Sequence, residues 1–485
     1  MNLEIDRNSP VAIYNQIAMR IEEQILSGEL SAEFKLPSER KLAAELKVHR
    51  NTVIKAYHKL INKELVIASQ NPKGYFIKSV KNTMNFGKRF FPLEKAFKYE
   101  CRWAEKTFNK FYWESENKNI ISFSGMVMPR NLNSVEGMHH IVDKIFNSRE
   151  NDNMSGFYRE TKHLKQNICN LLTKENIYVT YKNIQILSES NQIISYLMML
   201  YMREGDCIVA ETPMVPDVFS IFYNMGVKVI SIPMEEDGMN MQLLEEALDR
   251  YNPKFIYTQP NYHNPTGLTM SLKKRKYLLK LANDYNIPII EEDYQKDFTY
   301  NKEFLPSLYS LDTNRLVIYV YSFTLIFPYM MKIGYAVGPS DLIAMMEYAV
   351  SIHETAVSGI GQYFLNEYIE SGGLDKHIKI VQKEYKNRLE IICGELDKIK
   401  KGRLSYIKPK GGLIVWCKLD KCINERLLCK KAKEMGVLIM PGNVFYENDR
   451  SLNGHIRLCF SNTDERQIKE GIYLLGCALD ECGQS

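Results

Sequence analysis

Residues 36–61 read LPSERKLAAELKVHRNTVIKAYHKLI and contain two helix patterns separated by a short turn. Ser38 is a favourable N-cap, so the first helix is predicted to begin directly after it. The second helix is predicted to run from Arg50 to about Lys63, with apolar residues at three- and four-residue spacing that form one buried face. These apolar residues are Val53, Ala56, Tyr57, Leu60 and Ile61.

The opposite face of the second helix is basic, with Arg50, Asn51, Lys55, His58 and Lys59 predicted to face outward. Five Lys or Arg and no Asp or Glu lie between residues 47 and 63. Two helices joined by a tight turn, of which the second is basic at its start, form the geometry that places side chains in the major groove of DNA. A small helical domain with a solvated basic face is the alternative, and a run of charge alone favours that alternative.

The flanking segments complete a winged helix-turn-helix pattern. An amphipathic helix is predicted before the pair, from about Tyr14 to Ile25, and Gly28 is predicted to end it. After the pair, LVIAS and GYFI flank residues 70–73, which predicts a strand, a turn and a second strand. The whole arrangement, mainly α with a small β wing, favours DNA binding over simple solvation.

The residue types at the start of the basic helix suit contacts with bases and phosphates. Arginine pairs with guanine O6 and N7, and asparagine pairs with adenine N6 and N7. We therefore expect Arg50 and Asn51 to contact bases, and Thr52 and Lys55 to contact phosphates. The other residues expected at the DNA are Ser38, Glu39, Arg40 and Lys73.

From about residue 120 the chain alternates short apolar strands with helical stretches. The strand candidates are IQIL, CIVAE, VKVISI, FIYTQP, IPIIEED and LVIYVYS. This alternation predicts an α/β domain with a mostly parallel sheet. Polar residues follow two of these strands, at 259–267 and 291–294, where open α/β sheets place their ligands. We therefore expect a binding crevice at that edge of the sheet.

These patterns divide the 485 residues into three parts. We predict a winged helix-turn-helix domain at residues 1–78, a partly helical linker at 79–119 and the α/β domain at 120–485. The chain is 45% hydrophobic and 25% charged, which is ordinary for folded domains. A multidomain globular protein is therefore expected.

No membrane or metal signal accompanies these domains. The chain starts without an apolar leader, and its most apolar run, residues 193–202, is half of the about 20 residues that a bilayer-spanning helix needs. The ten cysteines include no C-x-x-C pair, so no zinc site is predicted. We expect a cytoplasmic protein with reduced cysteines and no membrane partner.

The segments PVAIYNQI, LPSERKLAAEL, VHRNTVIKAYHKL and GYFI together resemble the DNA-binding domain of the GntR family over about residues 10–77. The resemblance implies double-stranded DNA as the partner. One position departs from the family: His49 stands where a serine usually caps the recognition helix. A weaker cap is expected to cost about 1 kcal/mol and to leave the fold unchanged.

The segments REGDCIVAETPMVPDVF, YTQPNYHNPTGLTMSLKKR, IIEEDYQKDF, MKIGYAVGP and HIRLCFS resemble the aminotransferase domain of MocR-type regulators, a subfamily of GntR proteins. The resemblance extends from about residue 120 to the end. It implies a pyridoxal-phosphate-dependent aminotransferase fold, a homodimer with sites at the subunit boundary, and sensing of a small amine, amino acid or vitamin.

The position of the Schiff-base lysine departs from this family. In the run Ser322-Phe323-Thr324-Leu325 the residue at the lysine position is Leu325, and a one-residue shift of the alignment places Thr324 there instead. Neither side chain carries an amine, so covalent binding of the cofactor is predicted to be lost and no catalytic residue is predicted. Lys332 falls where the family has its phosphate-binding arginine.

Three further cofactor positions are altered. Glu189 replaces the glycine of the phosphate loop, and a carboxylate about 5 Å from a phosphate would be repelled by roughly 3 kcal/mol per charge pair at an effective dielectric constant near 20. Val215 replaces the aromatic residue that stacks on the cofactor ring. Glu292 replaces the aspartate that pairs with the ring nitrogen, although Asp293 is adjacent.

Other family positions are retained. The resemblance implies that Asn264 and Tyr294 bond the ring hydroxyl of the cofactor, and that Arg457 holds the carboxylate of an effector. Ser188, Ser322 and Thr324 belong to the same cofactor positions. A turn before a helix is the alternative role for Asn264, and a structural salt bridge is the alternative role for Arg457.

The sequence therefore predicts a DNA-binding transcription regulator rather than an enzyme. Its aminotransferase-like domain is expected to serve dimerisation and effector sensing without a covalent cofactor. The first alternative is a regulator that still binds pyridoxal phosphate, with an amine or amino acid as effector. The second alternative is an active aminotransferase. It is disfavoured because the sequence lacks the lysine that moves the proton during transamination.

Overall fold

The computed structural model describes residues 5–7, 9, 11–26, 30, 34–63, 65–70, 73–78, 120–129, 132, 143, 154–300, 305–327, 331–353, 357–399, 402–447 and 454–483, with the backbone alone at residues 26, 73 and 154–159. The chain forms two compact units, Met1–Ala96 and Phe97–Ser485. The predicted linker at residues 79–119 lies outside the described residues.

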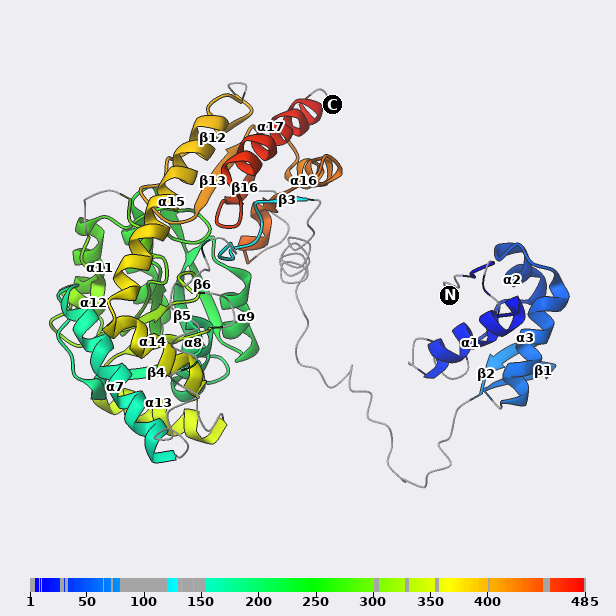
Figure 1. The fold of residues 1–485 in the computed structure, drawn as a ribbon, viewed down its shortest axis with the longest axis horizontal. Helices are drawn as coiled ribbons and strands as arrows, with labels where there is room; N and C mark the ends of the chain where they lie inside the picture. Colours follow the sequence, from blue (N-terminus) through cyan, green and yellow to red (C-terminus); the bar gives the residue numbers. More distant parts are fainter. Residues whose placement is uncertain are drawn as a thin grey trace. The chain divides into compact units, whose positions relative to one another are not determined.

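The N-terminal unit is the predicted winged helix-turn-helix. Its helices are α1 (Ile13–Leu26), α2 (Glu39–Glu45) and α3 (Arg50–Asn62), and its antiparallel wing strands are β1 (Val66–Gln70) and β2 (Lys73–Ile77) (Figure 1). Residues from all three helices meet in one small core, where Ile17, Leu42, Val53 and Tyr57 are almost fully buried. The apolar residues whose spacing predicted a buried face of α3 are the residues that pack into this core.

Side chains cap both helices of the helix-turn-helix. The Ser38 hydroxyl accepts a hydrogen bond from the backbone N–H of Lys41 at 3.3 Å, as predicted for the start of α2. At α3 the His49 ring also supplies a cap, because its Nδ1 accepts a hydrogen bond from the backbone N–H of Asn51 at 3.2 Å. An imidazole nitrogen thus takes the place of the serine hydroxyl that is usual in the family.

The larger unit is built on an eight-stranded sheet that is mostly parallel, as predicted. Among the described strands, β11 and β7 run in the direction opposite to that of the other strands of the sheet. In spatial order the strands are β4 (Ile184–Leu187), β11 (Gly334–Val337), β10 (Val317–Ser322), β9 (Ile289–Glu292), β8 (Phe255–Thr258), β5 (Cys207–Thr212), β6 (Lys228–Glu235) and β7 (Gly238–Met239).

Helices cover both faces of this sheet (Figure 1). Successive strand residues such as Ile289 and Ile290 belong to different apolar clusters, because alternate side chains point to opposite faces. One cluster includes α8 (Ser190–Tyr201), α9 (Pro216–Asn224) and α13 (Ser340–His353), and the other includes α10 (Met241–Tyr251), α11 (Leu272–Asp284) and α12 (Leu308–Leu311). Burial of both faces explains why these strands are apolar throughout.

The remaining elements form a smaller α+β layer. A four-stranded sheet has the order β12 (Leu404–Tyr406), β13 (Ile414–Leu419), β16 (His455–Cys459) and β15 (Met440–Pro441), and β14 (Val437–Leu438) pairs with β3 (Ile121–Ser122). The other helices are α7 (Met154–Thr173), α14 (Gly359–Glu370), α15 (Gly373–Leu396), α16 (Glu425–Glu434) and α17 (Glu465–Cys482), with short 3-10 turns η3 (Tyr181–Asn183), η4 (Lys296–Phe298) and η5 (Gly442–Phe445).

A buried carboxyl group supports the loop that follows β8. Glu211, at the end of β5, accepts hydrogen bonds from the Thr258 hydroxyl at 2.6 Å and from the backbone N–H of Gln259 at 2.8 Å. The ring of His263 lies 3.6 Å from the same carboxyl group. Burial raises the pKa of Glu211 to about 7 and lowers the pKa of His263 to about 3. The protonated form of Glu211 is therefore favoured in the folded state.

We predict that His49→Ala loosens the start of α3. Loss of the imidazole acceptor leaves the Asn51 amide without its cap and should cost about 1 kcal/mol of local stability. Hydrogen–deuterium exchange of the α3 amides in the full-length protein should become faster. His49→Ser should restore protection, whereas His58→Ala, at an exposed position in the same helix, should change little. Equal exchange in all three variants would contradict the role of His49.

A second prediction concerns pH. Because the pKa of Glu211 is raised to about 7 from an unfolded value near 4.3, its stabilising contribution is complete below about pH 4 and is lost as the pH rises through 7. Glu211→Gln should flatten this fall in melting temperature between about pH 5 and 8. Glu236→Gln, the same change at an exposed position, should leave the slope unchanged. An unaltered slope in Glu211→Gln would refute the assignment.

Candidate functional site

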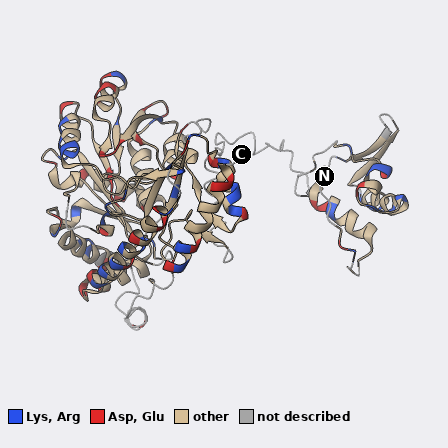
Figure 2. Cartoon of the chain, turned by 90° about the horizontal axis from the view of Figure 1, so that it is seen from above, with Lys and Arg blue, Asp and Glu red and all other residues tan. Residues whose placement is uncertain are grey.

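The N-terminal half of α3 carries polar side chains that are accessible to solvent. Arg50, Asn51 and Lys55 are exposed and Thr52 is half-buried. Figure 2 shows acidic residues interspersed among Lys and Arg on other helices, whereas α3 carries no Asp or Glu. A basic helix end with exposed polar side chains has the composition that a DNA contact requires.

The lysines in the C-terminal half of α3 are engaged within the unit. Lys59 was expected to face outward, but it is half-buried and its ammonium group donates to the Asn15 side chain at 2.7 Å. Lys63 forms an ion pair with Glu22 at 2.6 Å. Both contacts link α3 to α1, and Lys63 remains exposed.

The first residue of α3 is held by an acidic partner. Arg50 donates from Nε and Nη2 to one carboxylate oxygen of Glu39, at 2.9 and 2.7 Å. The other oxygen of Glu39 accepts a hydrogen bond from the Tyr75 hydroxyl at 2.7 Å. These contacts join α3, α2 and the wing strand β2, and they lower the pKa of the Glu39 carboxyl.

The remaining residues predicted at the DNA have different surroundings. Arg40 is exposed on α2, directly after Glu39. Ser38 is also exposed, although its hydroxyl acts as the cap of α2. Lys73 begins β2, and its side chain lies outside the described part of the chain.

A cavity lies where the carboxyl ends of β8, β9 and β10 meet the first turns of α8 and α9. Its position agrees with the crevice expected from the order of strands and polar residues. The described residues that line it are Glu189, Ser190, Asn191, Val215, Val218, Gln259, Asn264, Glu292, Tyr294, Ser322, Thr324 and Leu325. The structure thus brings together most of the family's cofactor positions that the sequence analysis named, together with Ser190, Asn191, Val218 and Gln259, which it did not.

The wall after β10 contains no amine. Leu325 is 5% exposed and presents an apolar side chain to the cavity. The hydroxyl groups of Ser322 and Thr324 lie 2.6 Å apart and bond to each other. None of the described residues that line the cavity is a lysine. The two candidates for the lysine position, Leu325 and Thr324, both lie in this lining and carry no amine.

An ion pair lies at the start of α8. Glu189 is the N-cap residue of this helix, and its carboxylate lies 2.8 Å from the ammonium group of Lys332. The two side chains are 29% and 32% exposed, so the pair is only partly screened by water. A carboxylate near the first amides of a helix also interacts favourably with the helix dipole. The sequence analysis located both charges but did not predict that they pair.

Glu292 is held in a buried hydrogen-bond network. Its carboxyl group accepts hydrogen bonds from the Tyr257 hydroxyl and, at 2.6 Å, from the Gln259 side chain. Burial raises the pKa of Glu292, although these bonds oppose the shift. Tyr257 and Gln259 are two residues apart, so strand alternation was the signal that could have placed both beside Glu292.

The neighbouring carboxylate does not substitute for Glu292. Asp293 points away from the cavity and accepts hydrogen bonds from the Asn261 side chain at 2.8 Å and from the Tyr319 hydroxyl at 3.1 Å. Burial raises its pKa to about 7. Adjacent residues at the end of a strand face opposite sides, which separates the two carboxyl groups.

Arg457, Asn264 and Tyr294 form a connected polar chain. Nη1 of Arg457 donates to the Asn264 side chain at 3.1 Å, and the Asn264 amide donates to the Tyr294 hydroxyl at 2.9 Å. Nη2 of Arg457 donates to the Ser124 carbonyl, and the guanidinium carbon lies 4.9 Å from the centre of the Phe445 ring. These contacts orient the guanidinium group of Arg457 from two sides.

Ser188 is placed differently from the other family positions. It is half-buried, its backbone N–H donates to the Gln192 side chain at 2.8 Å, and it is not among the described lining residues. The three residues that follow it line the cavity instead. The start of α8 therefore contributes through Glu189 and its two successors.

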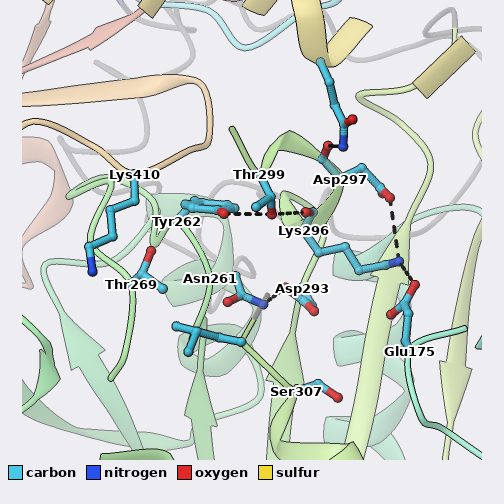
Figure 3. A pocket seen from close by; sticks show the side chains of 12 residues that line it. Glu175, Asn261, Tyr262, Thr269, Asp293, Lys296, Asp297, Thr299, Ser307 and Lys410 are labelled. Atoms are coloured by element: carbon cyan, nitrogen blue, oxygen red, sulfur yellow. Dashed lines mark hydrogen bonds and ion pairs between the residues drawn. The ribbon is translucent and has the colours of Figure 1, made fainter. Parts of the chain in front are cut away.

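Figure 3 shows a second cavity, which Asp293 and Asn261 help to line. In this cavity the ammonium group of Lys296 contacts the carboxylate of Glu175. It lies 3.7 Å from the carboxylate of Asp297. The charges of these three partly buried side chains thus compensate one another. Such mutual compensation is what buried charges need for stability.

Three further features of the described residues bear on function. No group of three or more His, Cys, Asp or Glu within the described ranges is arranged to hold a metal ion. The cysteines in those ranges are free thiols. None of the helices that the structure describes is both long enough and apolar enough to cross a bilayer.

Family models match both units. The model of class I and II aminotransferases matches residues 131–474, and the model of the gntR family of bacterial regulatory proteins matches residues 13–77. The first match alone covers more than half of the chain.

Some similar proteins match nearly the whole chain, and others match a part of it. The chain is 26% identical over 478 residues to the uncharacterized HTH-type transcriptional regulator YdfD of Bacillus subtilis (strain 168), covering 96% of each protein. It is 30% identical over 311 residues to aromatic-amino-acid aminotransferase 1 of Thermococcus litoralis, covering 63% of this chain and 74% of that protein.

A solved structure supports the same fold. The crystal structure of the kynurenine aminotransferase of Pyrococcus horikoshii, in complex with PMP, matches with a TM-score of 0.73 and 28% identity, over 81% of this chain and 97% of that one. Together with the winged helix-turn-helix, these matches identify the architecture. The chain belongs to the class I and II aminotransferase family, and because a GntR domain precedes that fold it is a GntR-type transcription regulator of the MocR arrangement.

Proposed function

We propose that this regulator contacts DNA through the start of α3 and that its aminotransferase-like unit senses a small ligand without forming a Schiff base. The observation that carries the second part is Leu325, an apolar residue in the cavity at the family's lysine position. Without an amine there, the family's lysine position offers no group that could bind a cofactor aldehyde covalently.

The ion pair between Glu189 and Lys332 supports the loss of the phosphorylated cofactor. At the family's phosphate subsite a cation normally faces the phosphate, whereas here Lys332 faces a carboxylate of the protein itself. A phosphate at this subsite would be attracted less strongly by Lys332, whose charge is already paired, and it would be repelled by the carboxylate of Glu189. We infer that the residues of this cavity do not fit pyridoxal phosphate, so no catalytic step through it is assigned.

The polar chain of Arg457, Asn264 and Tyr294 supports a carboxylate-bearing effector. A guanidinium group binds a carboxylate through parallel hydrogen bonds, and burial in the protein strengthens such contacts. Arg457 is 1% exposed and is oriented by Asn264 and the Ser124 carbonyl. An amino acid, or a small amine that also carries a carboxylate, is the ligand class that this arrangement suits.

The remaining parts of the proposal follow from the role in transcription. We propose that the large unit also mediates a homodimer, since paired half-sites on DNA require paired recognition helices. The residues proposed to contact DNA are Ser38, Arg40, Arg50, Asn51, Thr52, Lys55 and Lys73. Glu39, which was expected in the same set, is proposed to act through Arg50. The protein is proposed to act in the cytoplasm, where its DNA is located, and to have no transaminase activity.

DNA binding is tested with duplexes that the full-length protein selects from a randomised pool. Arg50→Ala should weaken binding to the selected duplex by roughly 5- to 150-fold, because a bidentate arginine–guanine pair contributes about 1–3 kcal/mol. Arg20→Ala removes the same charge from an exposed position of α1 and should have little effect. Equal binding by wild type and Arg50→Ala would contradict the proposed contact.

Loss of the covalent cofactor is tested by rebuilding the site. Wild-type protein incubated with pyridoxal phosphate and borohydride should form no adduct at residue 325 by mass spectrometry. The double variant Leu325→Lys, Glu189→Gly should gain both an adduct and a visible absorption band, because an amine is added and the repelling carboxylate is removed. Leu325→Met with Glu189→Gly is the matched control, and an adduct at the wild-type cavity would overturn the proposal.

A further inference from the structure

The contacts of Arg50 leave one edge of its guanidinium group available. A guanidinium group has five N–H donors in a planar fork. Glu39 occupies the side edge, since Nε and Nη2 both donate to its Oε2 atom at 2.9 and 2.7 Å. The end edge, formed by Nη1 and the second hydrogen of Nη2, carries two parallel donors that these contacts do not use.

Two parallel donors match one base in the major groove. Guanine presents the two acceptors O6 and N7 side by side, whereas adenine presents N7 beside the N6 donor. A guanidinium group that is fixed by its side edge and turned end-on therefore distinguishes guanine from adenine. A mobile Arg50 could instead turn toward a phosphate, which carries no sequence information.

Glu39 is itself held in place from the wing. Its Oε1 atom accepts a hydrogen bond from the Tyr75 hydroxyl at 2.7 Å, and the Tyr75 ring lies 4.7 Å from the ring of buried Tyr57. The Tyr57 hydroxyl donates to the Pro37 carbonyl at 2.8 Å, just before α2. The carboxylate is thus fixed by a partner that is anchored in the core of the unit.

The stability of the protein does not explain this arrangement. The Arg50 side chain is 50% exposed and that of Glu39 is 17% exposed, and pairs exposed to this degree contribute little to folding. A negative charge beside a DNA-binding helix also opposes the attraction of phosphates. A role in orientation explains an acid at this place better than a role in folding or in general DNA affinity.

We propose that Glu39 is a positioning residue that presents Arg50 end-on to a guanine, and that Tyr75 couples this orientation to the wing. The inference deepens the proposed DNA contact of Arg50 and rests on it. It assigns one base per half-site, a guanine, to the start of α3. Glu39 then lowers the nonspecific affinity for DNA through its negative charge and increases the preference for guanine.

The test measures base preference with the full-length protein. Duplexes selected from a randomised pool are compared with duplexes in which each recurring guanine is replaced by adenine, and with a duplex of random sequence. Glu39→Ala should reduce the discrimination at one position of each half-site by about tenfold, the scale of a lost bidentate contact. Its binding to the random duplex at low salt should be equal or tighter, since a repelling charge is removed.

Matched variants separate orientation from folding and from charge. Glu45→Ala removes an exposed acid from the same helix and should leave the guanine preference intact. Tyr75→Phe deletes only the hydroxyl and should relax the same position partially. In an Arg50→Ala background, Glu39→Ala should cause no further loss of preference, because the two residues act through one contact.

Three outcomes would overturn the inference. The first is a selected site with no guanine that depends on Arg50. The second is a Glu39→Ala variant that keeps full discrimination at that guanine. The third is a uniform loss of affinity for all duplexes in Glu39→Ala, which is the result of a merely structural role. If the wild-type chain bound no duplex at all, the proposed DNA contact itself would fail and this inference with it.

Discussion

The large unit depends on the burial of both faces of its parallel sheet. Adjacent strand residues such as Ile289 and Ile290 enter separate apolar clusters, so helices must cover each face. A sheet buried in this way has no open face on which a ligand could lie. Polar side chains collect at the carboxyl ends of β8, β9 and β10, and the cavity forms there for that reason.

At this edge the protein supplies its own charges and hydrogen-bond partners. Lys332 faces Glu189, Glu292 faces Tyr257 and Gln259, and Arg457 is oriented by Asn264. Lys332 and Glu292 are thereby paired within the protein at positions where the resemblance implies contacts with a cofactor. The covered sheet supplies the buried apolar surface that stabilises this frame.

The N-terminal unit uses the same physical device for another purpose. Charged groups that have a fixed partner keep a fixed direction, and in α3 the partners of Lys59, Lys63 and Arg50 come from α1 and α2. The two lysines link α3 to α1, while Arg50 is the residue proposed to contact a guanine. Under this proposal, attachment and selectivity belong to different residues of one segment.

Local patterns in the sequence were sufficient for the elements and for much of the cavity. The spacing of Val53 and Tyr57 placed the buried face of α3, the apolar runs placed the strands, and the residue at position 325 revealed the missing amine. These features depend on neighbours along the chain, or on a family motif that is itself contiguous. The type of the principal elements, and most of the residues that line the cavity, could therefore be predicted.

Pairings across the fold were decided by the tertiary structure alone. Glu39 shares its carboxylate between Arg50 and Tyr75, which lie 11 and 36 residues away, and Glu189 meets Lys332 from a distant segment. His49 was read as a weakened cap, yet its ring accepts the hydrogen bond that a serine would accept. Such contacts depend on which elements pack together and on side-chain rotamers, and neither is encoded in the periodicity of a single segment.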